Sequence, residues 1–208
     1  MTEKPISPEV LAPAGDMERL QSALLYGADA VYLAGQQFGM RSGCPNFSMD
    51  ELRQAVDLCH RQKKAVHVTC NVVPRGYELD SIAEFLTECG HIGVDAFIIS
   101  DLGVMALARR CAPQVSVHVS TQAGVMNEET ARFLYEQAAA RVVLARELSL
   151  QEVARIRANT PTDLEIETFV HGSMCVSFSG RCLLSNYFTG RDGNHGDCAQ
   201  PCRWKYSL

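Results

Sequence analysis

Four cysteines near the end of the sequence form the group whose residue types could do the most distinctive chemistry. Cys175, Cys182, Cys198 and Cys202 follow the spacing C-x₆-C-x₁₅-C-x₃-C. A zinc ribbon uses two CxxC turns, and neither pair here has that spacing. Four thiolates from looser loops suit an iron–sulfur cluster, and the loop 189–197 between them is rich in turn-forming residues. The spacing therefore favours a cluster over zinc, with unligated thiols as the remaining alternative.

Polar side chains alternate with apolar ones along three predicted strands, which places the polar set on one face. His67 and His118 are on this face of two central strands, and Glu167 is on it in the last strand. Helices should cover the apolar face, so the polar face would line a barrel interior. These three residues, with Glu147 and His171 at strand ends, are the candidate catalytic groups. Satisfied buried hydrogen bonds without chemistry are the alternative for each of them.

Residues expected in the loops beyond the strands could form the rim of a binding pocket. This set comprises Arg41, Asn71, Gln122, Arg146 and Arg181. A guanidinium recognises carboxylates and phosphates through paired hydrogen bonds, so we expect the set to bind substrate. An ordinary solvated or paired arginine is the alternative. Asp101 and Ser149 also lie between a predicted strand and a predicted helix, and for them helix capping is the better interpretation.

Short apolar segments alternate with amphipathic helical patterns along most of the chain. Strands are expected at 9–12, 30–34, 65–71, 96–100, 115–120, 141–145 and 164–170. Helices are expected at 16–26, 48–62, 79–89, 102–111, 128–138 and 150–158. Asp16 and Ser48 should cap the first two helices, with Glu51 completing a capping box. This order predicts a parallel α/β fold, and the polar alternation favours a TIM-like (β/α) barrel over a doubly wound sheet.

Seven strands precede the cysteine-rich end, whereas a closed (β/α)₈ barrel needs eight and typically about 250 residues. We therefore expect an incomplete barrel over 1–172, with the eighth unit missing and the chain a fragment or a split protein. A cluster-binding segment over 173–208 should pack on the carboxyl-terminal face of that barrel. The open edges of the first and last strands would accept the missing carboxyl-terminal part, a related second protein, or a second copy as a homodimer.

Composition excludes several classes of protein. The chain has 208 residues, of which 47% are hydrophobic and 21% charged, and its net charge is −5. These values are those of a globular protein and not of a disordered or fibrous one. No run of about 18 apolar residues occurs and the first ten residues lack a signal-peptide core, so we expect a cytoplasmic protein with no membrane partner. The acidity argues against a sequence-independent DNA coat but leaves room for RNA held by a local patch.

The stretch 167–185, ETFVHGSMCVSFSGRCLLS, resembles the signature of peptidase family U32, the collagenase-like peptidases of unassigned catalytic type. Four further stretches agree with this family, namely LAPAG at 11–15, YGADAVY at 26–32, RELS at 146–149 and CAQPCRW at 198–204. The resemblance covers essentially the whole chain. It implies a protease by the family name, and an RNA or quinone hydroxylation factor by other members.

The match around 179–185 and 202–204 is most similar to the prephenate-dependent tRNA uridine hydroxylation branch. That resemblance implies formation of 5-hydroxyuridine, tRNA or another RNA as partner, and prephenate as a co-substrate. It also implies a 4Fe–4S cluster on Cys175, Cys182, Cys198 and Cys202, with Cys44 as a minor alternative ligand.

The residues themselves give the peptidase interpretation little support. Neither HExxH nor GxSxG occurs, and a serine two positions from a histidine does not make a dyad. We therefore favour an iron–sulfur protein that supports hydroxylation of an RNA base. A U32-type peptidase is the first alternative, and a non-catalytic iron–sulfur scaffold or electron-transfer subunit is the second.

Overall fold

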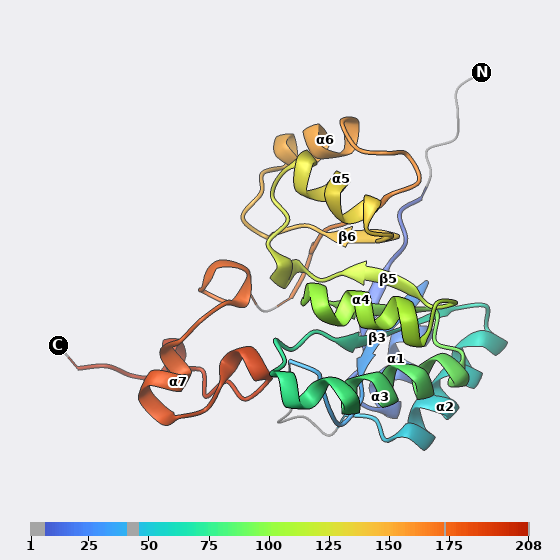
Figure 1. Ribbon diagram of the computed structural model, residues 1–208, viewed down its shortest axis with the longest axis horizontal. Helices are drawn as coiled ribbons and strands as arrows, with labels where there is room; N and C mark the ends of the chain where they lie inside the picture. The colour runs from blue at the N-terminus through green and yellow to red at the C-terminus, as the bar shows by residue number, and fades with distance from the viewer. Residues whose placement is uncertain (1–6, 41–45, 173, 208) are drawn as a thin grey trace.

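One sheet of seven parallel strands forms the centre of the computed structural model, which describes residues 7–40, 46–172 and 174–207 (Figure 1). The strands are β1 Leu11–Pro13, β2 Ala30–Ala34, β3 Ala65–Cys70, β4 Ala96–Ile99, β5 Ser116–Val119, β6 Arg141–Val143 and β7 Glu165–Glu167. Each pairs in parallel with the next one along the chain. Helices connect successive strands, which is the arrangement of a (β/α) barrel.

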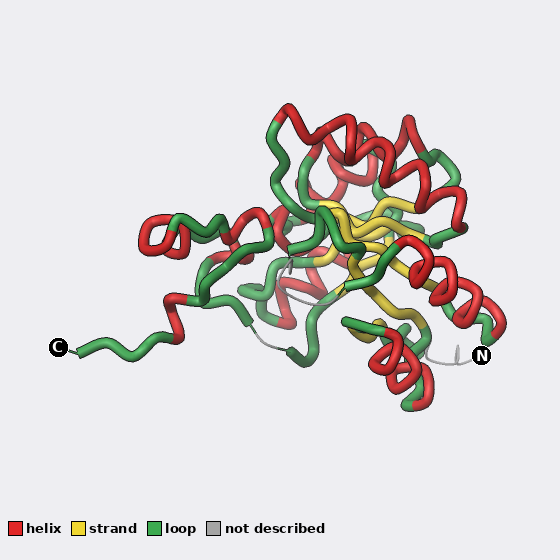
Figure 2. The backbone as a smooth tube through the Cα atoms, turned by 90° about the horizontal axis from the view of Figure 1, so that it is seen from below, coloured by secondary structure: helices red, strands yellow, loops and turns green. Residues whose placement is uncertain are grey.

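The sheet curls until its two ends approach one another. The guanidinium of Arg141, at the start of β6, lies 2.9 Å from the carboxylate of Glu9, just before β1. Among the described residues no ladder joins β7 to β1, so the strands form a half-barrel and not a closed ring. Figure 2 shows the strands as a curved group with helices around it. The prediction of an incomplete TIM-like barrel with seven strands is thus confirmed.

Within the described residues, six α-helices connect the strands and a seventh follows β7. They are α1 Met17–Leu25, α2 Met49–Arg61, α3 Leu79–Ile92, α4 Leu102–Cys111, α5 Glu128–Glu136, α6 Leu150–Ala158 and α7 Leu184–Thr189. The side chains of Asp16, Ser48, Asp101 and Ser149 each accept a backbone N–H of the first turn, as their residue types predicted. Within the described part of the chain, no helix is long and apolar enough to span a bilayer.

The main hydrophobic core lies between the sheet and the helices. Val66, Val68, Val117 and Val119 are almost completely buried in it, together with apolar residues from each of the six connecting helices. Their neighbours in the sequence, which point to the other side of the sheet, include the polar residues of the interior. Alternation along the strands therefore separates the packing that stabilises the fold from the polar interior.

The first and last strands differ from the sequence-based expectation. Strand β1 begins at Leu11 and ends at Pro13, two residues later than predicted at its start. Strand β7 has three residues where seven were predicted, and the side chains of Phe169 and Val170 beyond it are exposed. Each of these strands has a neighbour on only one side among the described residues, so apolar alternation alone could not set their ends.

Candidate functional site at the carboxyl end of the half-barrel

Loops after β5, β6 and β7 bring several predicted residues to the carboxyl end of the half-barrel. Gln122 lies in a short 3₁₀ turn, Thr121–Ala123, directly after β5. Arg146 and Glu147 follow β6, and Phe169 and His171 follow β7. Active sites of (β/α) barrels lie at this end, because the loops that vary without disturbing the sheet are here.

Arg146 is the cation of this end that is best prepared to hold an anion. Its guanidinium carbon lies 4.3 Å from the centre of the Phe169 ring, in a cation–π contact. Its Nε–H is buried and has no hydrogen-bond acceptor, and no carboxylate among the described residues forms an ion pair with it. The aromatic face therefore fixes the plane of the guanidinium while its charge stays uncompensated, which suits a carboxylate or phosphate of a ligand.

Glu147 holds the cysteine-containing segment against this end. Its Oε1 accepts the backbone N–H of Ser179 at 3.1 Å. Ser179 lies in a 3₁₀ turn, Phe178–Gly180, with a φ of 44°, a left-handed conformation that is uncommon for serine. Its side chain is buried, and the hydroxyl has no described hydrogen-bond partner. Ser179 was not among the predicted site residues, although it lies within the stretch 167–185 that resembles family U32.

Arg181 makes a further contact between this segment and the half-barrel, where His195 and Glu78 also pair. Its Nε–H donates to the backbone carbonyl of Gln122 at 3.0 Å. The side-chain Oε1 of Gln122 accepts the hydroxyl of Ser100 at 3.2 Å, so this amide joins the loops after β4 and β5. In the structure both residues position loops, and their predicted binding of substrate stays a prediction.

The remaining rim residues are more dispersed. The Oδ1 of Asn71, after β3, accepts the backbone N–H of Met40 at 3.1 Å and so holds the loop after β2. His171 is exposed in the loop after β7. Arg41 and Cys44 lie outside the described residues.

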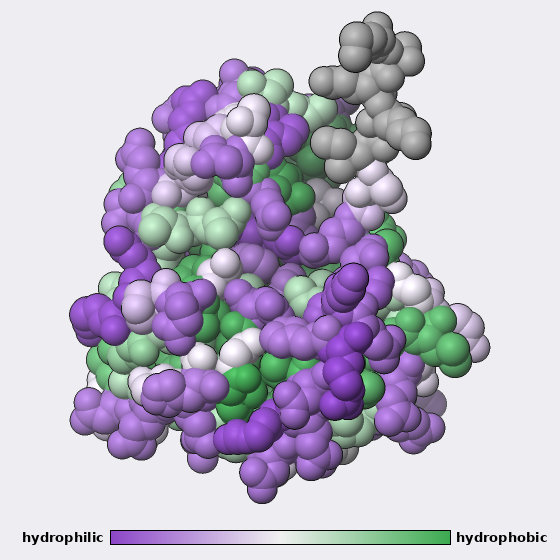
Figure 3. Space-filling view, turned by 90° about the vertical axis from the view of Figure 1, so that its right-hand side faces the viewer, coloured by the Kyte–Doolittle hydropathy of each residue, from purple (hydrophilic) through white to green (hydrophobic). Residues whose placement is uncertain are grey.

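The other candidate catalytic residues lie at the opposite end of the half-barrel. His67 and His118 line an open cavity of about 250 Å³ with residues at or before the starts of β4 to β7. The two imidazole rings meet edge to face, with centroids 4.6 Å apart. Figure 3 views the molecule from the side opposite the cysteine segment and shows a largely hydrophilic surface there.

Buried charges accompany the two histidines. Arg141 forms ion pairs with Glu9, Glu165 and Glu167, at 2.9, 2.6 and 3.1 Å respectively. Burial, together with the nearby Arg141 charge, lowers the pKa of His67 to about 4. Burial is the largest cause and the neighbouring His67 the second, and together they lower the pKa of His118 to about 2. Both imidazoles are therefore neutral at pH 7, and burial raises the pKa of the Glu167 carboxyl.

His67 and His118 thus form one group, which Glu167 joins through its ion pair with Arg141, and Glu147 and His171 lie near the other end. The alternation that placed the first three on the interior face was correct. It did not predict the height of each residue along the barrel, because that height depends on the stagger between neighbouring strands.

The cysteines divide into two environments. Cys59, Cys70 and Cys89 are completely buried, and burial raises the pKa of their thiols to about 11, 12 and 12 respectively. These thiols stay protonated and pack as small apolar side chains. The four late cysteines are different, because Cys182 is half-buried and the other three are exposed.

Two of the late cysteines accept local backbone hydrogen bonds at sulfur. The Sγ of Cys182 accepts the N–H of Leu184 at 3.4 Å, and the Sγ of Cys198 accepts the N–H of Gln200 at 3.3 Å. Such N–H···S contacts stabilise a thiolate and tune bound clusters. Among the described side chains, however, no three His, Cys, Asp or Glu groups converge as a single metal ion requires. The donor chemistry fits a cluster, whereas a gathered site is not present in this arrangement.

Comparison with known proteins identifies the family. The model of peptidase family U32 matches residues 15–208. The chain belongs to peptidase family U32. The 167–185 stretch that resembled this family includes Ser179 and Arg181, which join the cysteine segment to the half-barrel.

Three relatives have different names. The tRNA hydroxylation protein P1 of Bacillus subtilis is 42% identical over 201 residues, which are 97% of this chain and 47% of that protein. The uncharacterized protease MJ0090 of Methanocaldococcus jannaschii is 44% identical, over 96% of this chain and 49% of that protein. The 23S rRNA 5-hydroxycytidine C2501 synthase of Escherichia coli is 39% identical, over 96% and 30%. The chain spans about half the length of the first two relatives and 30% of the length of the third.

A solved structure supports the fold. The U32 peptidase Mk0906 superposes with a TM-score of 0.65 and 19% identity, over 81% of this chain and 71% of that one. At this identity the likeness concerns the path of the backbone alone.

Proposed function

We propose that this chain is part of a protein that hydroxylates an RNA base, with a tRNA uridine as the preferred substrate and 5-hydroxyuridine as the product. The observation that carries the proposal is Arg146, a guanidinium that is stacked on Phe169 and has no acidic partner among the described residues. Arg146 lies at the end of the half-barrel where barrel enzymes bind substrate. Relatives that match nearly the whole of this chain are named for hydroxylation of tRNA and rRNA.

At this end, the residues of the chain bind and position. The planar fork of Arg146 would hold a phosphate of the RNA or a carboxylate of a small co-substrate such as prephenate. Glu147 and Gln122 hold the cysteine segment beside it through Ser179 and Arg181. A ligand bound to Arg146 would therefore lie next to the segment that carries the cysteines.

We further propose that Cys175, Cys182, Cys198 and Cys202 hold a 4Fe–4S cluster, with zinc as the alternative metal. Their thiols are free, none is completely buried, and backbone N–H groups already donate to two of the sulfurs. A bound cluster would supply one-electron transfer beside the carboxyl end of the half-barrel.

The peptidase alternative lacks a described nucleophile and base in contact. Among the residues that the structure covers, no serine, threonine or cysteine side chain hydrogen-bonds to a histidine. Histidine–carboxylate pairs do occur, between His60 and Asp95 and between His195 and Glu78, but neither includes a nucleophile. The family name is the remaining support for this alternative.

Deletion of the gene followed by mass spectrometry of total RNA nucleosides tests the proposed function. We expect loss of one hydroxylated nucleoside and its recovery when the parent gene is returned. A gene encoding Arg146→Ala should restore much less of it, whereas Arg132→Ala, which changes an exposed arginine on α5, should restore it fully. An unchanged nucleoside profile, with gelatin cleavage by the pure protein, would establish the peptidase alternative.

Metal content tests the cluster separately. Protein purified without oxygen should contain iron and sulfide in equal amounts, and Cys198→Ala should remove both. Cys111→Ala changes a half-buried cysteine outside the segment and should leave them unchanged. Stoichiometric zinc without iron would replace the cluster by the zinc alternative.

A further inference from the structure

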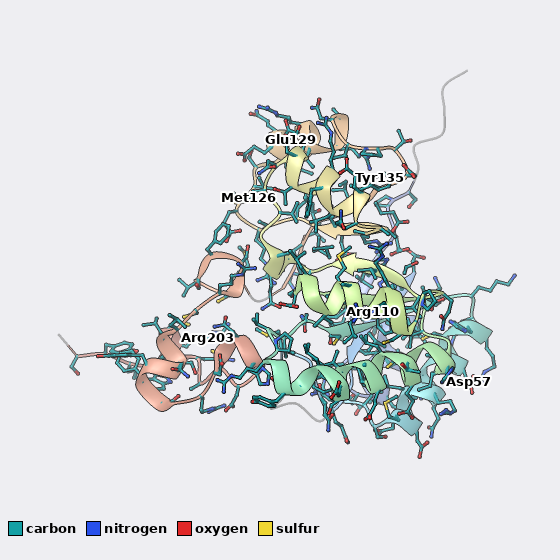
Figure 4. The ribbon with its side chains drawn as sticks, in the orientation of Figure 1. Asp57, Arg110, Met126, Glu129, Tyr135 and Arg203 are labelled. Carbon is teal, nitrogen blue, oxygen red and sulfur yellow. The ribbon has the colours of Figure 1, made fainter. Side chains whose placement is uncertain are left out.

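Exposed aromatic rings gather on the cysteine segment, in the part that extends furthest from the half-barrel. Tyr187 and Phe188 on α7 have ring centroids 5.2 Å apart, and Phe188 lies 6.1 Å from Trp204. The exposed fractions of Tyr187, Phe188 and Trp204 are 82%, 51% and 44%. Figure 4 shows this part of the chain, where Arg203 is labelled, apart from the strands and helices of the half-barrel. We call these three rings and Tyr206 the aromatic patch.

The aromatic patch is held in place by polar contacts that leave ring surface open. The Nε1–H of Trp204 donates to the carbonyl of Ala199 at 3.2 Å. The hydroxyl of Tyr206 donates to the carbonyl of Pro201 at 2.8 Å, and this ring is 62% exposed. The indole and phenol are therefore oriented before any ligand binds, which lowers the entropy lost on binding.

Positive charge surrounds the aromatic patch. Residues 173–208 contain four basic and two acidic residues, a net charge of +2 in a chain whose total is −5, so the other residues sum to −7. Arg203 and Lys205 flank Trp204, are exposed, and form no ion pair within the described residues. A cationic aromatic surface on an acidic protein is complementary to a phosphate backbone with accessible bases.

We infer that the aromatic patch binds unpaired RNA, with bases stacked on Tyr187 and Trp204 and phosphates held by Arg203 and Lys205. This inference rests on the proposed function for the kind of nucleic acid, and it assigns the contact to a surface separate from Arg146. Exposed apolar residues elsewhere, such as Tyr26 and Leu150, lack such a ring cluster and are the isolated kind that any protein surface carries. Stacking needs splayed bases, so the patch should favour a loop or single strand over a duplex.

Binding of a fluorescein-labelled 12-nucleotide single-stranded RNA to the full-length protein, measured by anisotropy, tests this inference. Tyr187→Ala and Trp204→Ala should each weaken binding about tenfold, because one stacked base is lost. Tyr187→Phe keeps the ring and should bind like the parent, and Tyr26→Ala, a matched exposed tyrosine on the half-barrel, should also do so. Lys205→Ala should reduce the slope of log affinity against log salt by about 1.

Trp204 also supplies a direct signal, measured as the difference in tryptophan fluorescence between the parent and Trp204→Phe. Its fluorescence should be quenched by the single-stranded RNA and much less by a duplex of the same sequence. Equal RNA affinity of the parent, Tyr187→Ala and Trp204→Ala proteins would overturn the inference, and so would loss of a protein partner on these substitutions with no change in RNA affinity. Nucleoside profiling of the deletion strain reports on the proposed function independently. If the deletion strain loses a nucleoside but the variants keep the RNA affinity of the parent, only the RNA-binding role of the aromatic patch is contradicted. If the nucleoside profile is unchanged but the variants bind RNA more weakly, only the proposed hydroxylation is contradicted.

Discussion

The two ends of the half-barrel use arginine in opposite ways. At the end where the strands begin, Arg141 is buried and is surrounded by the carboxylates of Glu9, Glu165 and Glu167. At the end where they finish, Arg146 stacks on Phe169 and has no described acidic partner. Arg141 and Arg146 are five positions apart, yet the charge of the first is compensated by carboxylates and the charge of the second is available to a ligand.

This difference separates a structural role from a binding role. The Arg141 cluster joins β6, β7 and the segment before β1, so its interactions hold the curled sheet together where no described ladder closes it. Removal of a buried charge that has partners affects folding, whereas removal of an uncompensated surface charge affects ligands.

Arg141→Ala should lower the free energy of unfolding by about 3 kcal/mol, because three carboxylates would share a partly buried site without their cation. Urea unfolding at pH 7 measures this loss. Arg132→Ala, which removes an exposed ion pair with Glu129, should cost less than about 1 kcal/mol. Equal losses in the two variants would show that the cluster at the start of the strands is not a structural centre.

The buried histidines should make stability depend on pH. Their pKa values of about 4 for His67 and about 2 for His118 are below the unfolded value near 6.5. Below that value the unfolded chain binds protons that the folded chain does not, so stability falls as pH decreases toward each folded pKa. When the pH falls from 7.5 to 5.5, each histidine should lower the free energy of unfolding by about 1.4 kcal/mol.

In the parent, the free energy of unfolding should be lower at pH 5.5 than at pH 7.5, and His118→Leu should make this difference smaller by about 1.4 kcal/mol. Gln151→Leu, which changes an exposed residue without a titratable side chain on α6, serves as the control and should leave that difference as in the parent. A pH dependence that is the same in the parent and in His118→Leu would show that His118 takes up its proton at the same pH in the folded and unfolded states.

Glu147→Ala should loosen the cysteine segment and leave the half-barrel intact, at a cost of about 1 kcal/mol. The lost acceptor is the one that holds the backbone N–H of Ser179. Hydrogen exchange followed by mass spectrometry should show faster exchange in peptides from 174–207 and no change in β3 to β5. Glu136→Ala, at the exposed end of α5, is the matched control. Faster exchange throughout the half-barrel would place Glu147 in the folding core instead.

Arg146→Lys should change the free energy of unfolding by less than about 0.5 kcal/mol. It keeps the charge but loses the planar fork, so the hydroxylated nucleoside restored to the deletion strain should fall about tenfold. Arg141→Lys gives the opposite comparison, since it should destabilise the fold. Full nucleoside recovery by Arg146→Lys would mean that a point charge is sufficient at this position.

Local sequence patterns predicted most of the fold. Asp16, Ser48, Asp101 and Ser149 cap helices because each side chain reaches only the first turn that follows it. The valine faces of β3 and β5 are buried against helices because side chains alternate along a strand. Periodicity could not set the length of β7, since that strand depends on neighbours far away in the chain.

The candidate site was predicted in its residue types and not in its grouping. Local patterns indicated which positions face the interior, which arginines follow strands, and that four cysteines share one segment. The fold places Arg141 and the two histidines at one end and Arg146 with Phe169 at the other. It also brought Glu147 to Ser179 across 32 positions. The reason is physical: side-chain alternation and capping are set within a few residues, whereas the curl and stagger of the sheet decide which distant residues meet.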